Sequence, residues 1–487
     1  MSLDAAALDE LRALLGEQGV FASDAALFVH EADAMTLQRS RPDVVVLPRS
    51  TDEVSAVVRW ARVKGLPVTA RGAGTGLAGG CTCEHGGVAL SVNRMDQVLA
   101  IDEERMFAWV QPGLVNLWLS QKVAPVGLTV APDPASQQVS TIGGNAATNA
   151  GGPHCLKYGV TLNHILGLTV VLADGSAVTL GGEACDAPGF DLASIVIGSE
   201  GTLGVITEVC VRLVPAAEAV KTILFDFPRI VDACEAVSQV IAEGIVPAAM
   251  EIMDQSTVAL VEAWLQIGLP TDAAAVLLIE IDGPATALPG QAERIVEIAH
   301  LHGVRSVRVA RDDAERATLW RGRKSAFGAW GRTGKSFYVL DGVVPRTRLA
   351  EALGSVHVMA GARGLHAGSV SHAGDGNIHP HIMFDPTVPG QQADAHAVEL
   401  EILRMCIRFG GTITGEHGVG IEKRPMMPEQ FAPEDLGVME RARAAFDPAR
   451  MLNPGKILPG HAGHESPHPP VAMSAPHARA DVEGPWT

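Results

Sequence analysis

Apolar residues in the first part of the chain follow strand and helix spacings in turn. Residues 43–48 (DVVVLP) and 66–70 (LPVTA) are apolar runs of strand length, and VSAVVRWARVKG between them has the spacing of an amphipathic helix. Ser50, followed three residues later by Glu53, forms a capping box at the start of that helix. We therefore expect a βαβ unit that leads into the glycine-rich loop RGAGTGLAGG.

The same patterns continue along the chain and change near residues 215–219. Before that point we expect strands at 88–92, 106–112, 165–180 and 203–215. Asp174–Gly175 inside the third of these is a strong signal for a two-residue hairpin turn. Beyond it, strands (222–228, 248–254, 275–283, 304–310) alternate with helices (229–244, 256–268, 290–303). This alternation predicts an α+β sandwich with helices on one face of its sheet.

Length, charge and cysteine content indicate how many domains the protein has, which partners it excludes and in which compartment it lies. The 487 residues are enough for two to four domains, and the net charge of −18 repels phosphate backbones, which excludes nucleic acid as a partner. The N-terminus lacks the pattern of a signal peptide, and no apolar run is long enough to span a bilayer. Seven sparse, irregularly spaced cysteines indicate reduced thiols in a cytoplasmic protein.

Three glycine-rich stretches are candidates for a ligand site. Gly74 to Gly79 matches G-x-G-x-x-G, but CTCEHGGVAL follows it without the helix that a dinucleotide-binding Rossmann motif requires. Successive N–H groups of residues 71–77 can instead form a nest that binds an anion. The stretches 132–152 and 197–208 are also rich in small residues and suit the surface of a large ligand. Tight turns in an α+β domain are the alternative.

The stretch SHAGDGNIHPHI, residues 371–382, is the densest polar cluster of the chain. A turn at Gly-Asp-Gly can bring His372 and His379 to one side, and Asp375 between two glycines is typical of a turn. Two histidines and a carboxylate with an open position form the ligand set of a catalytic divalent metal, and GEHG supplies Glu416. A hydrogen-bonded turn with surface histidines remains the alternative at this level.

Six motifs together resemble a known family. ARGAGTGL, PDPASQQVSTIGGNAATNAGG, IGSEGTLGVITE, HAGDGNIHP, TGEHGVG and FDPARMLNPGK occur in this order. They are similar to the FAD-linked oxidases of the vanillyl-alcohol oxidase / p-cresol methylhydroxylase fold, over about residues 15–460. Within that fold they resemble the D-2-hydroxyacid dehydrogenase branch, above all the flavoprotein subunits of bacterial glycolate oxidases.

The resemblance implies an α+β fold with a two-subdomain FAD-binding (PCMH-type) domain and an α+β substrate cap that has an antiparallel sheet. The expected parts are a helical N-terminal segment (1–40), the FAD-binding domain (41–218), the cap (219–410), a C-terminal segment that completes the site (411–460) and a disordered tail (461–487).

The resemblance also implies which residues bind FAD. Some relatives attach FAD to a histidine in the first glycine-rich loop; residues 71–80 contain none, so we expect FAD without a covalent link. The implied cofactor-binding residues are Arg71, Gly72, Ala73, Gly74, Thr75, Gly76, Leu77, Pro132, Asp133, Ser136, Thr141, Gly143, Gly144, Thr148, Gly151, Gly152, Glu200, Gly204, Ile206 and Asn453.

For the reaction itself, the resemblance implies oxidation of a 2-hydroxy acid to the 2-oxo acid, with hydride transfer to N5 of FAD. His372, His379 and Glu416 would bind a zinc-like divalent metal, and His417 would be the base. Arg323 would hold the substrate carboxylate, with Lys324 as the second choice.

The substrate expected from the resemblance is small. His381 stands where hydroxyglutarate enzymes have a substrate-contacting asparagine, so it is a candidate substrate contact. Phe327 stands near a position where those enzymes have a threonine, and YVLDG lacks their lysine. These differences favour glycolate or D-lactate, with D-2-hydroxyglutarate as the alternative.

Electrons must leave through a partner or a diffusible carrier, because the chain has no iron–sulfur cysteine set. The resemblance implies a second flavin-type subunit and an iron–sulfur subunit, and hence a peripheral place at the inner face of the plasma membrane. Three rival functions remain to be distinguished: an NAD-linked dehydrogenase, a metal-dependent hydrolase and a non-catalytic flavin-binding subunit.

Overall fold

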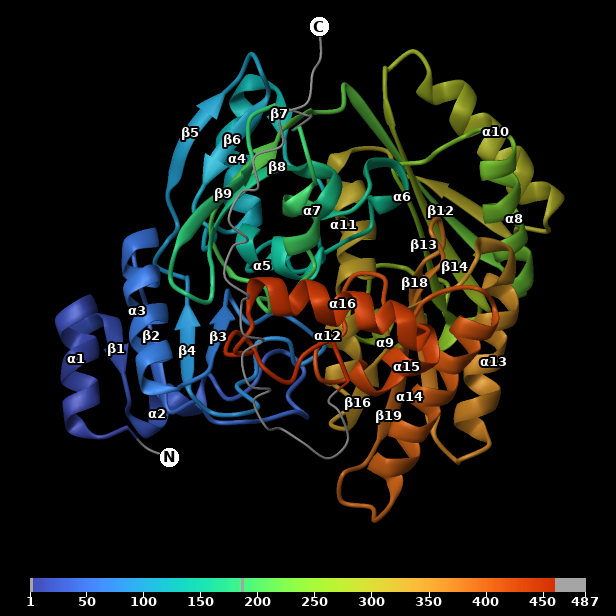
Figure 1. Ribbon diagram of the computed structural model, residues 1–487. Helices are drawn as coiled ribbons and strands as arrows, with labels where there is room; N and C mark the ends of the chain where they lie inside the picture. The colour runs from blue at the N-terminus through green and yellow to red at the C-terminus, as the bar shows by residue number, and fades with distance from the viewer. Residues whose placement is uncertain (1–2, 185–187, 460–487) are drawn as a thin grey trace, which may run out of the picture.

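Residues 3–184 and 188–459 are described by the computed structural model (Figure 1). Cys185 and the tail expected to be disordered lie outside these residues. Within the described ranges no helix has both the length and the apolar character needed to cross a bilayer, and the cysteines there are free thiols.

The predicted βαβ unit is confirmed in the first sheet, whose strand order is β1-β2-β4-β3. Strands β2 (Val44–Val46), β4 (Val88–Ser91) and β3 (Val68–Arg71) are parallel, and helix α3 (Thr51–Lys64) connects β2 to β3. The Ser50 hydroxyl accepts the N–H of Glu53 at 3.2 Å. The Glu53 carboxylate accepts the N–H of Arg49 rather than that of Ser50, so the capping box is only half formed.

The N-terminal segment, expected to be helical, also adds a strand to this sheet. It contains α1 (Ala5–Leu15) and α2 (Asp24–Phe28), and between them β1 (Val20–Phe21) pairs antiparallel with β2. The expectation was incomplete because two residues are too short for a recognisable strand pattern. Val20 is nevertheless buried in the same apolar cluster as β2 and α3.

A second sheet has the order β5-β6-β10-β8-β9 and is antiparallel. Its strands are β5 (Val98–Asp102), β6 (Phe107–Val110), β10 (Val205–Arg212), β8 (Ile165–Val171) and β9 (Ala177–Gly181). The hairpin predicted at Asp174–Gly175 is confirmed, but its turn is longer than two residues. The turn joins Val171 to Ala177, and within it the Asp174 carboxylate accepts both the N–H and the hydroxyl of Ser176, at 2.8 and 2.6 Å.

The third part contains an antiparallel sheet of order β15-β12-β14-β13-β18-β19-β16, with β17 paired to β19. The predicted strands correspond to β12 (Ala219–Phe227), β13 (Ala249–Asp254), β14 (Ala275–Gly283) and β15 (Ser306–Val309). The predicted helices correspond to α8 (Ile230–Ala242), α9 (Gln255–Leu265) and α10 (Leu288–Leu301). The remaining strands are β16 (Ser336–Val339), β17 (Gly342–Val343), β18 (His366–His372) and β19 (Asn377–Phe384).

Helices cover both faces of this sheet, not one face as expected. On one face α8, α10, α13 (Leu349–Gly361) and α14 (Gln391–Arg408) pack over Ile223, Phe225 and Phe227. On the other, α9, α11 (Asp313–Lys324) and α12 (Ala326–Gly331) pack over alternate residues such as Leu224 and Leu278. The strands are apolar on both sides, so their pattern did not distinguish one covered face from two.

The C-terminal segment returns from the cap to the first sheet (Figure 1). After α14 come the short helix α15 (Met427–Gln430) and α16 (Pro433–Phe446). The chain then passes along β3, where the N–H of Val68 donates to the carbonyl of Met451 at 2.8 Å and the N–H of Asn453 donates to the carbonyl of Val68 at 2.7 Å. Residues far apart in sequence thus frame one region between the sheets.

A charged cluster joins the part of the chain before β8 to the third sheet. His154 lies just before α6 (Cys155–Tyr158); its Nδ1 contacts Asp133 and its Nε2 lies 3.4 Å from Glu280 of β14. Arg316 and Trp320 of α11 also donate to Glu280. Burial alone would lower the pKa of His154, but the two carboxylates outweigh it and raise the pKa to about 10.

We expect this contact to make stability depend on pH. Because the folded pKa of His154 lies above its ordinary value of 6.5, its contribution is complete below pH 6.5 and is lost as the pH rises through about 10. Between pH 7 and pH 10 the protein should lose on the order of 3 kcal/mol of its free energy of unfolding through this histidine. Melting curves of wild type and His154→Gln should therefore converge towards pH 10, whereas a constant difference across this range would contradict the assignment.

Candidate active site

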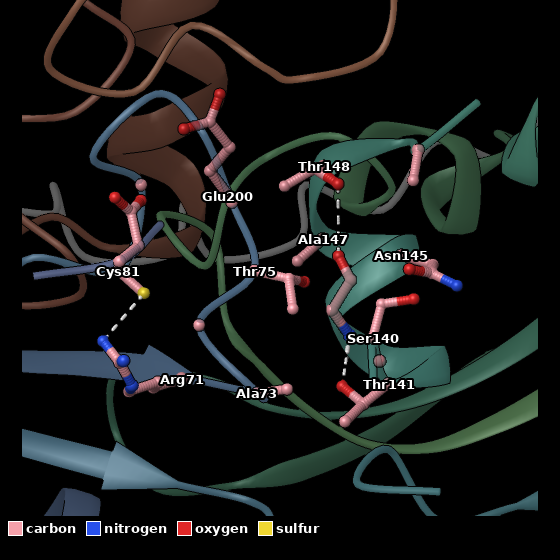
Figure 2. A pocket seen from close by; sticks show the side chains of 18 of the residues that line it. Arg71, Ala73, Thr75, Cys81, Ser140, Thr141, Asn145, Ala147, Thr148 and Glu200 are labelled. Carbon is pink, nitrogen blue, oxygen red and sulfur yellow. Dashed lines mark hydrogen bonds between the residues drawn. The ribbon is translucent and has the colours of Figure 1, made fainter. Parts of the chain in front are cut away.

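A cavity of about 220 Å³ lies between the first two sheets and the C-terminal segment. All three glycine-rich stretches line it, as the sequence predicted. Figure 2 shows the side chains of Arg71, Thr75, Thr141 and Asn145 around this space. Glu416 and His417 of the GEHG motif line it too, so the expected ligand site and the histidine cluster meet in one place.

The first glycine-rich loop does not have the Rossmann arrangement. Residues 72–87 contain no helix, which confirms that the G-x-G-x-x-G match is not a dinucleotide fingerprint. Arg71 donates to the carbonyl of Ala32 at 2.8 Å and to Sγ of Cys81 at 3.2 Å, the second of which Figure 2 marks. Gly74 has φ +73°, and a Cβ there would come within 2.2 Å of the Arg71 guanidinium, so this turn requires glycine.

Most of the residues implied for FAD binding line the cavity, including residues 71–77, Ser136, Thr141 and Glu200. The others in this group are Gly143, Gly144, Thr148, Gly151, Gly204 and Ile206. Four lie elsewhere: Pro132, Asp133, Gly152 and Asn453 are not among the lining residues.

Two of these four have clear structural partners. Asp133 contacts His154. Asn453 donates through Nδ2 to the carbonyls of Gly80 and Glu200, at 2.8 and 2.6 Å. Asn453 therefore links the C-terminal segment to two residues of the cavity wall without itself lining the cavity.

Glu200, in the cavity wall, is hydrogen-bonded to the two residues that follow the GEHG motif. Its carboxylate accepts the N–H of Val419 at 2.7 Å and that of Gly420 at 2.9 Å. Burial raises the pKa of Glu200, and the two hydrogen bonds lower it. The effect of burial is the larger one, so the pKa is raised to about 7.

Polar atoms without partners show that the cavity suits a large polar ligand such as FAD. Oδ2 of Asp33 and Oγ of Ser140 are buried, line the cavity and have no hydrogen-bond partner within the described chain. Buried polar atoms are normally satisfied, so they are places where a ligand hydroxyl, amide or water would bind. The glycines beside them leave room for a flat ring and a phosphate chain.

At the cap end of the cavity, Glu416 lies against three imidazoles. Its Oε1 is 3.3 Å from Nε2 of His372, 3.1 Å from Nε2 of His379 and 3.9 Å from Nε2 of His417. Strands β18 and β19 are paired around the Gly-Asp-Gly turn, so His372 and His379 come to one side as the sequence indicated. Their ligand atoms and that of Glu416 lie within 4.8 Å of one another.

The other nitrogen of each of these two histidines is already occupied. Nδ1 of His372 contacts Oε1 of Glu251 at 2.7 Å, and Nδ1 of His379 donates to the carbonyl of Leu340 at 3.0 Å. Metal-binding histidines in proteins have this arrangement, which leaves the Nε2 lone pair for the ion. Burial would lower the pKa of His372, but Glu251 and Glu416 outweigh it and raise the pKa well above 6.5, so the site attracts positive charge. The donor set therefore fits a divalent metal.

His417 stacks on His379, with ring centroids 5.0 Å apart and planes at 15°. Its Nδ1 is buried without a partner in the described chain. Burial lowers the pKa of His417 to about 4, although the Asp341 carboxylate opposes the shift. At neutral pH the imidazole is therefore uncharged and able to accept a proton.

Arg323 and Lys324 come from the end of α11. Arg323 is 6% exposed, and its Nε donates to Oε2 of Glu251 at 2.5 Å. It thus continues the chain of contacts from His372 through Glu251. Lys324 is further from the cluster, with its Nζ 3.7 Å from Asp133 and 5.5 Å from the ring centroid of Trp320.

His381 shares a strand face with His379 and lies in an aromatic enclosure. Its ring stacks on Trp330 at 5.6 Å, and Phe337 and Phe327 lie 5.6 and 6.3 Å away. Its Nδ1 donates to the carbonyl of His379, so the buried, unpartnered Nε2 is an acceptor. Burial, together with His379 and Arg323, lowers the pKa of His381 to about 3.

Asp375 has the local contact of a turn former, because its Oδ1 accepts the N–H of Asn377 at 3.1 Å. Sequence reasoning missed Glu251, Asp341 and Asp33. Glu251 and Asp341 are lone carboxylates in apolar stretches (AMEIM and YVLDGVV), a pattern that signals a buried polar contact. Asp33, in EADAM, has a second acid two residues before it, so its sequence gives no such signal.

Comparison with known proteins places these observations in a family. A model of the C-terminal domain of FAD linked oxidases matches residues 216–457, and an FAD binding domain model matches residues 42–181. Glycolate oxidase subunit GlcD of Escherichia coli is 43% identical over 90% of this chain and 88% of its own length.

A second relative and one solved structure are also similar to this chain. A D-lactate dehydrogenase of Anaerostipes hadrus is 34% identical over 88% of this chain and 92% of its own length. The structure of p-cresol methylhydroxylase with bound substrate is similar in fold, with a TM-score of 0.77 at 17% identity over 93% of this chain and 96% of that one.

Proposed function

The chain belongs to the FAD-linked oxidases and is an FAD-dependent oxidoreductase of small 2-hydroxy acids, and we propose that its substrate is a monocarboxylate such as glycolate or D-lactate. The alternative substrate in the same class is D-2-hydroxyglutarate. An NAD-linked Rossmann enzyme is excluded by the fold, and membership of this family excludes a hydrolase.

One observation carries the proposal: the cavity lined by the glycine-rich loops ends at Glu416 and His417. A cofactor in that cavity and a substrate at the histidine cluster would be in direct contact. The same arrangement argues against a non-catalytic flavin-binding subunit, because His372, His379, Glu416 and His417 are all present and assembled.

Two groups would complete the site. FAD, held without a covalent link by residues 71–77, 136–151 and 200–206, would accept the hydride from the substrate carbon. A divalent, zinc-like ion held by His372, His379 and Glu416 would lower the pKa of the substrate hydroxyl.

The protein's own residues would then carry out three tasks. His417, kept neutral by burial, would take the hydroxyl proton on its imidazole. Arg323 would offer its remaining guanidinium N–H groups to the substrate carboxylate while Glu251 holds it in place. The contacts of His154 with Asp133 and Glu280 would hold the cap against the FAD-binding part and so limit the entry of water during the transfer.

The surroundings of His381 support a small substrate with one carboxylate. The imidazole is uncharged, its Nε2 can only accept a hydrogen bond, and Trp330, Phe337 and Phe327 enclose it. The cation that acts on His381 is Arg323, which is already paired with Glu251. A second carboxylate brought there would therefore be buried without a cation of its own, which is strongly unfavourable. Lys324 is paired with Asp133, with its Nζ 3.7 Å from Oδ2 of that carboxylate.

The relative GlcD is one subunit of a glycolate oxidase. By analogy we propose that this chain passes electrons to a second flavin-type subunit and an iron–sulfur subunit. Those partners would keep it on the cytoplasmic side, at the inner face of the membrane.

The direct test is a substrate screen with a dye as electron acceptor. Purified protein should reduce the dye with glycolate or D-lactate, and turnover with D-2-hydroxyglutarate should be roughly 100-fold weaker because the second carboxylate has no partner. Equal or better turnover of hydroxyglutarate would replace the proposed substrate with the alternative one.

A further inference from the structure

Asp341, between β16 and β17, is a fully buried carboxylate that accepts hydrogen bonds from the backbone of the GEHG loop. Its Oδ2 accepts the hydroxyl of Thr414 at 2.6 Å, the N–H of Gly415 at 3.1 Å and the N–H of His417 at 2.9 Å. The N–H of Glu416 lies 3.2 Å from both of its oxygens. Three consecutive backbone donors therefore converge on one anion.

The remaining contacts of Asp341 reach the other half of the histidine cluster. Lys423 donates through Nζ at 3.0 Å, and Asn377, at the start of β19, donates through Nδ2 at 2.9 Å. The carbonyl of the preceding residue, Leu340, accepts Nδ1–H of His379 at 3.0 Å. Two neighbouring residues thus fix the loop that carries Glu416 and the ring of His379.

Asp341 is not itself a metal ligand, although one of its oxygens lies within 4.8 Å of nitrogens of His379 and His417. Both oxygens already accept several hydrogen bonds, and one faces the ammonium of Lys423. A second cation there would have to displace that ammonium and strip a buried carboxylate of its donors. The contacts of Asp341 therefore hold the neighbouring residues in place and leave it no free oxygen to bind a metal.

We propose that Asp341 is a positioning residue for the reaction. It holds the backbone from Gly415 to His417 so that the Glu416 carboxylate and the His417 imidazole reach the same point. Hydrogen bonds to an anion are stronger than neutral ones, and this anion has no exposure to water that would weaken them. The proposal rests on the function proposed for Glu416 and His417. Loss of such a support typically costs about 10–100-fold in metal affinity or activity.

The variant Asp341→Asn tests this with almost no change in volume, because it replaces one acceptor oxygen with an NH₂ group that faces donors. We expect FAD content to stay at the wild-type level while metal content and kcat fall by about 10–100-fold. Hydrogen exchange of the peptide 412–420 should become at least about ten times faster, because its amides lose their acceptor.

Asp254→Asn is the matched control. That carboxylate is also buried and also accepts backbone N–H groups, from Thr257 at 2.9 Å and from Ser369 at 2.7 Å, but it does not touch the GEHG loop. It should lower the melting temperature and leave kcat, metal content and exchange of 412–420 unchanged. A purely structural role for Asp341 would make the two variants behave alike, which would overturn the proposal.

The remaining outcomes separate this inference from the proposed function. If wild type oxidises no 2-hydroxy acid, the proposed function fails, and unchanged exchange of 412–420 in Asp341→Asn would independently overturn the role of Asp341. If that variant does not fold, Thr414→Val removes the hydroxyl that lies 2.6 Å from Asp341. The same hydroxyl also lies 3.1 Å from the carbonyl of Gly418 and accepts from Nζ of Lys423 at 3.4 Å, so those two contacts within the loop are lost with it. This second variant should raise loop exchange and lower kcat a few-fold, and wild-type behaviour in both would count against the proposal.

Discussion

Replacing His417 with alanine should reduce turnover of glycolate or D-lactate by roughly 10²–10⁴-fold, the usual contribution of a general base. Burial lowers the pKa of this imidazole to about 4, so it is unprotonated at neutral pH, as a base must be. Its ring lies at the end of the cavity, stacked on His379. The measurement is kcat with saturating dye acceptor, together with the flavin content of each preparation.

The variant should remain yellow and fully loaded with FAD, because no residue that shapes the glycine-rich loops changes. His366→Ala is a suitable control, since His366 starts the same strand as His372 but is exposed. Turnover near the wild-type rate in His417→Ala would remove His417 from the mechanism.

Loss of the proposed metal should have an effect of similar size. Glu416→Gln keeps the shape of the side chain but removes the charge that lies 3.3 and 3.1 Å from Nε2 of His372 and His379. We expect bound divalent metal to fall from about one per chain to near zero, with at least about a 100-fold loss of kcat/KM, because a Lewis acid contributes several kcal/mol. Elemental analysis and steady-state kinetics measure the two effects separately.

Asp375→Asn provides the contrast within the same turn. Asparagine supports such a turn as well as aspartate does, so metal content and turnover should stay near wild type. A loss of metal in this variant would make Asp375 a ligand. Full activity of metal-free wild-type protein would instead contradict the metal assignment altogether.

Local patterns were enough to predict much of the fold. The βαβ unit around Ser50 and the strand–helix alternation after Val220 depend on short-range spacing, and both are confirmed. The strand β1 and the second covered face of the cap sheet were missed. Their existence depends on packing between segments distant in sequence, on which a local apolar run carries no information.

In the candidate site, too, the residues with a local sequence signal were predicted and those that depend on distant partners were not. His372 and His379 were recognisable because a Gly-Asp-Gly turn lies between them, and the geometry brings them together with Glu416. Glu251 and Asp341 were not found because their partners are 121 and 76 positions away along the chain, and only the folded sheet brings them into contact. The prediction for Arg323 concerned a substrate contact, whereas the contact that the fold provides is with Glu251.

A 2-hydroxy acid is expected to deliver a hydride to FAD held in the cavity lined by the glycine-rich loops. Anaerobic mixing of purified protein with glycolate or D-lactate, followed by absorbance at about 450 nm, tests this expectation without any partner or dye. The flavin band should bleach within the time of a few turnovers. A fully FAD-loaded protein whose band is unchanged by every 2-hydroxy acid, yet bleaches with dithionite, would contradict it.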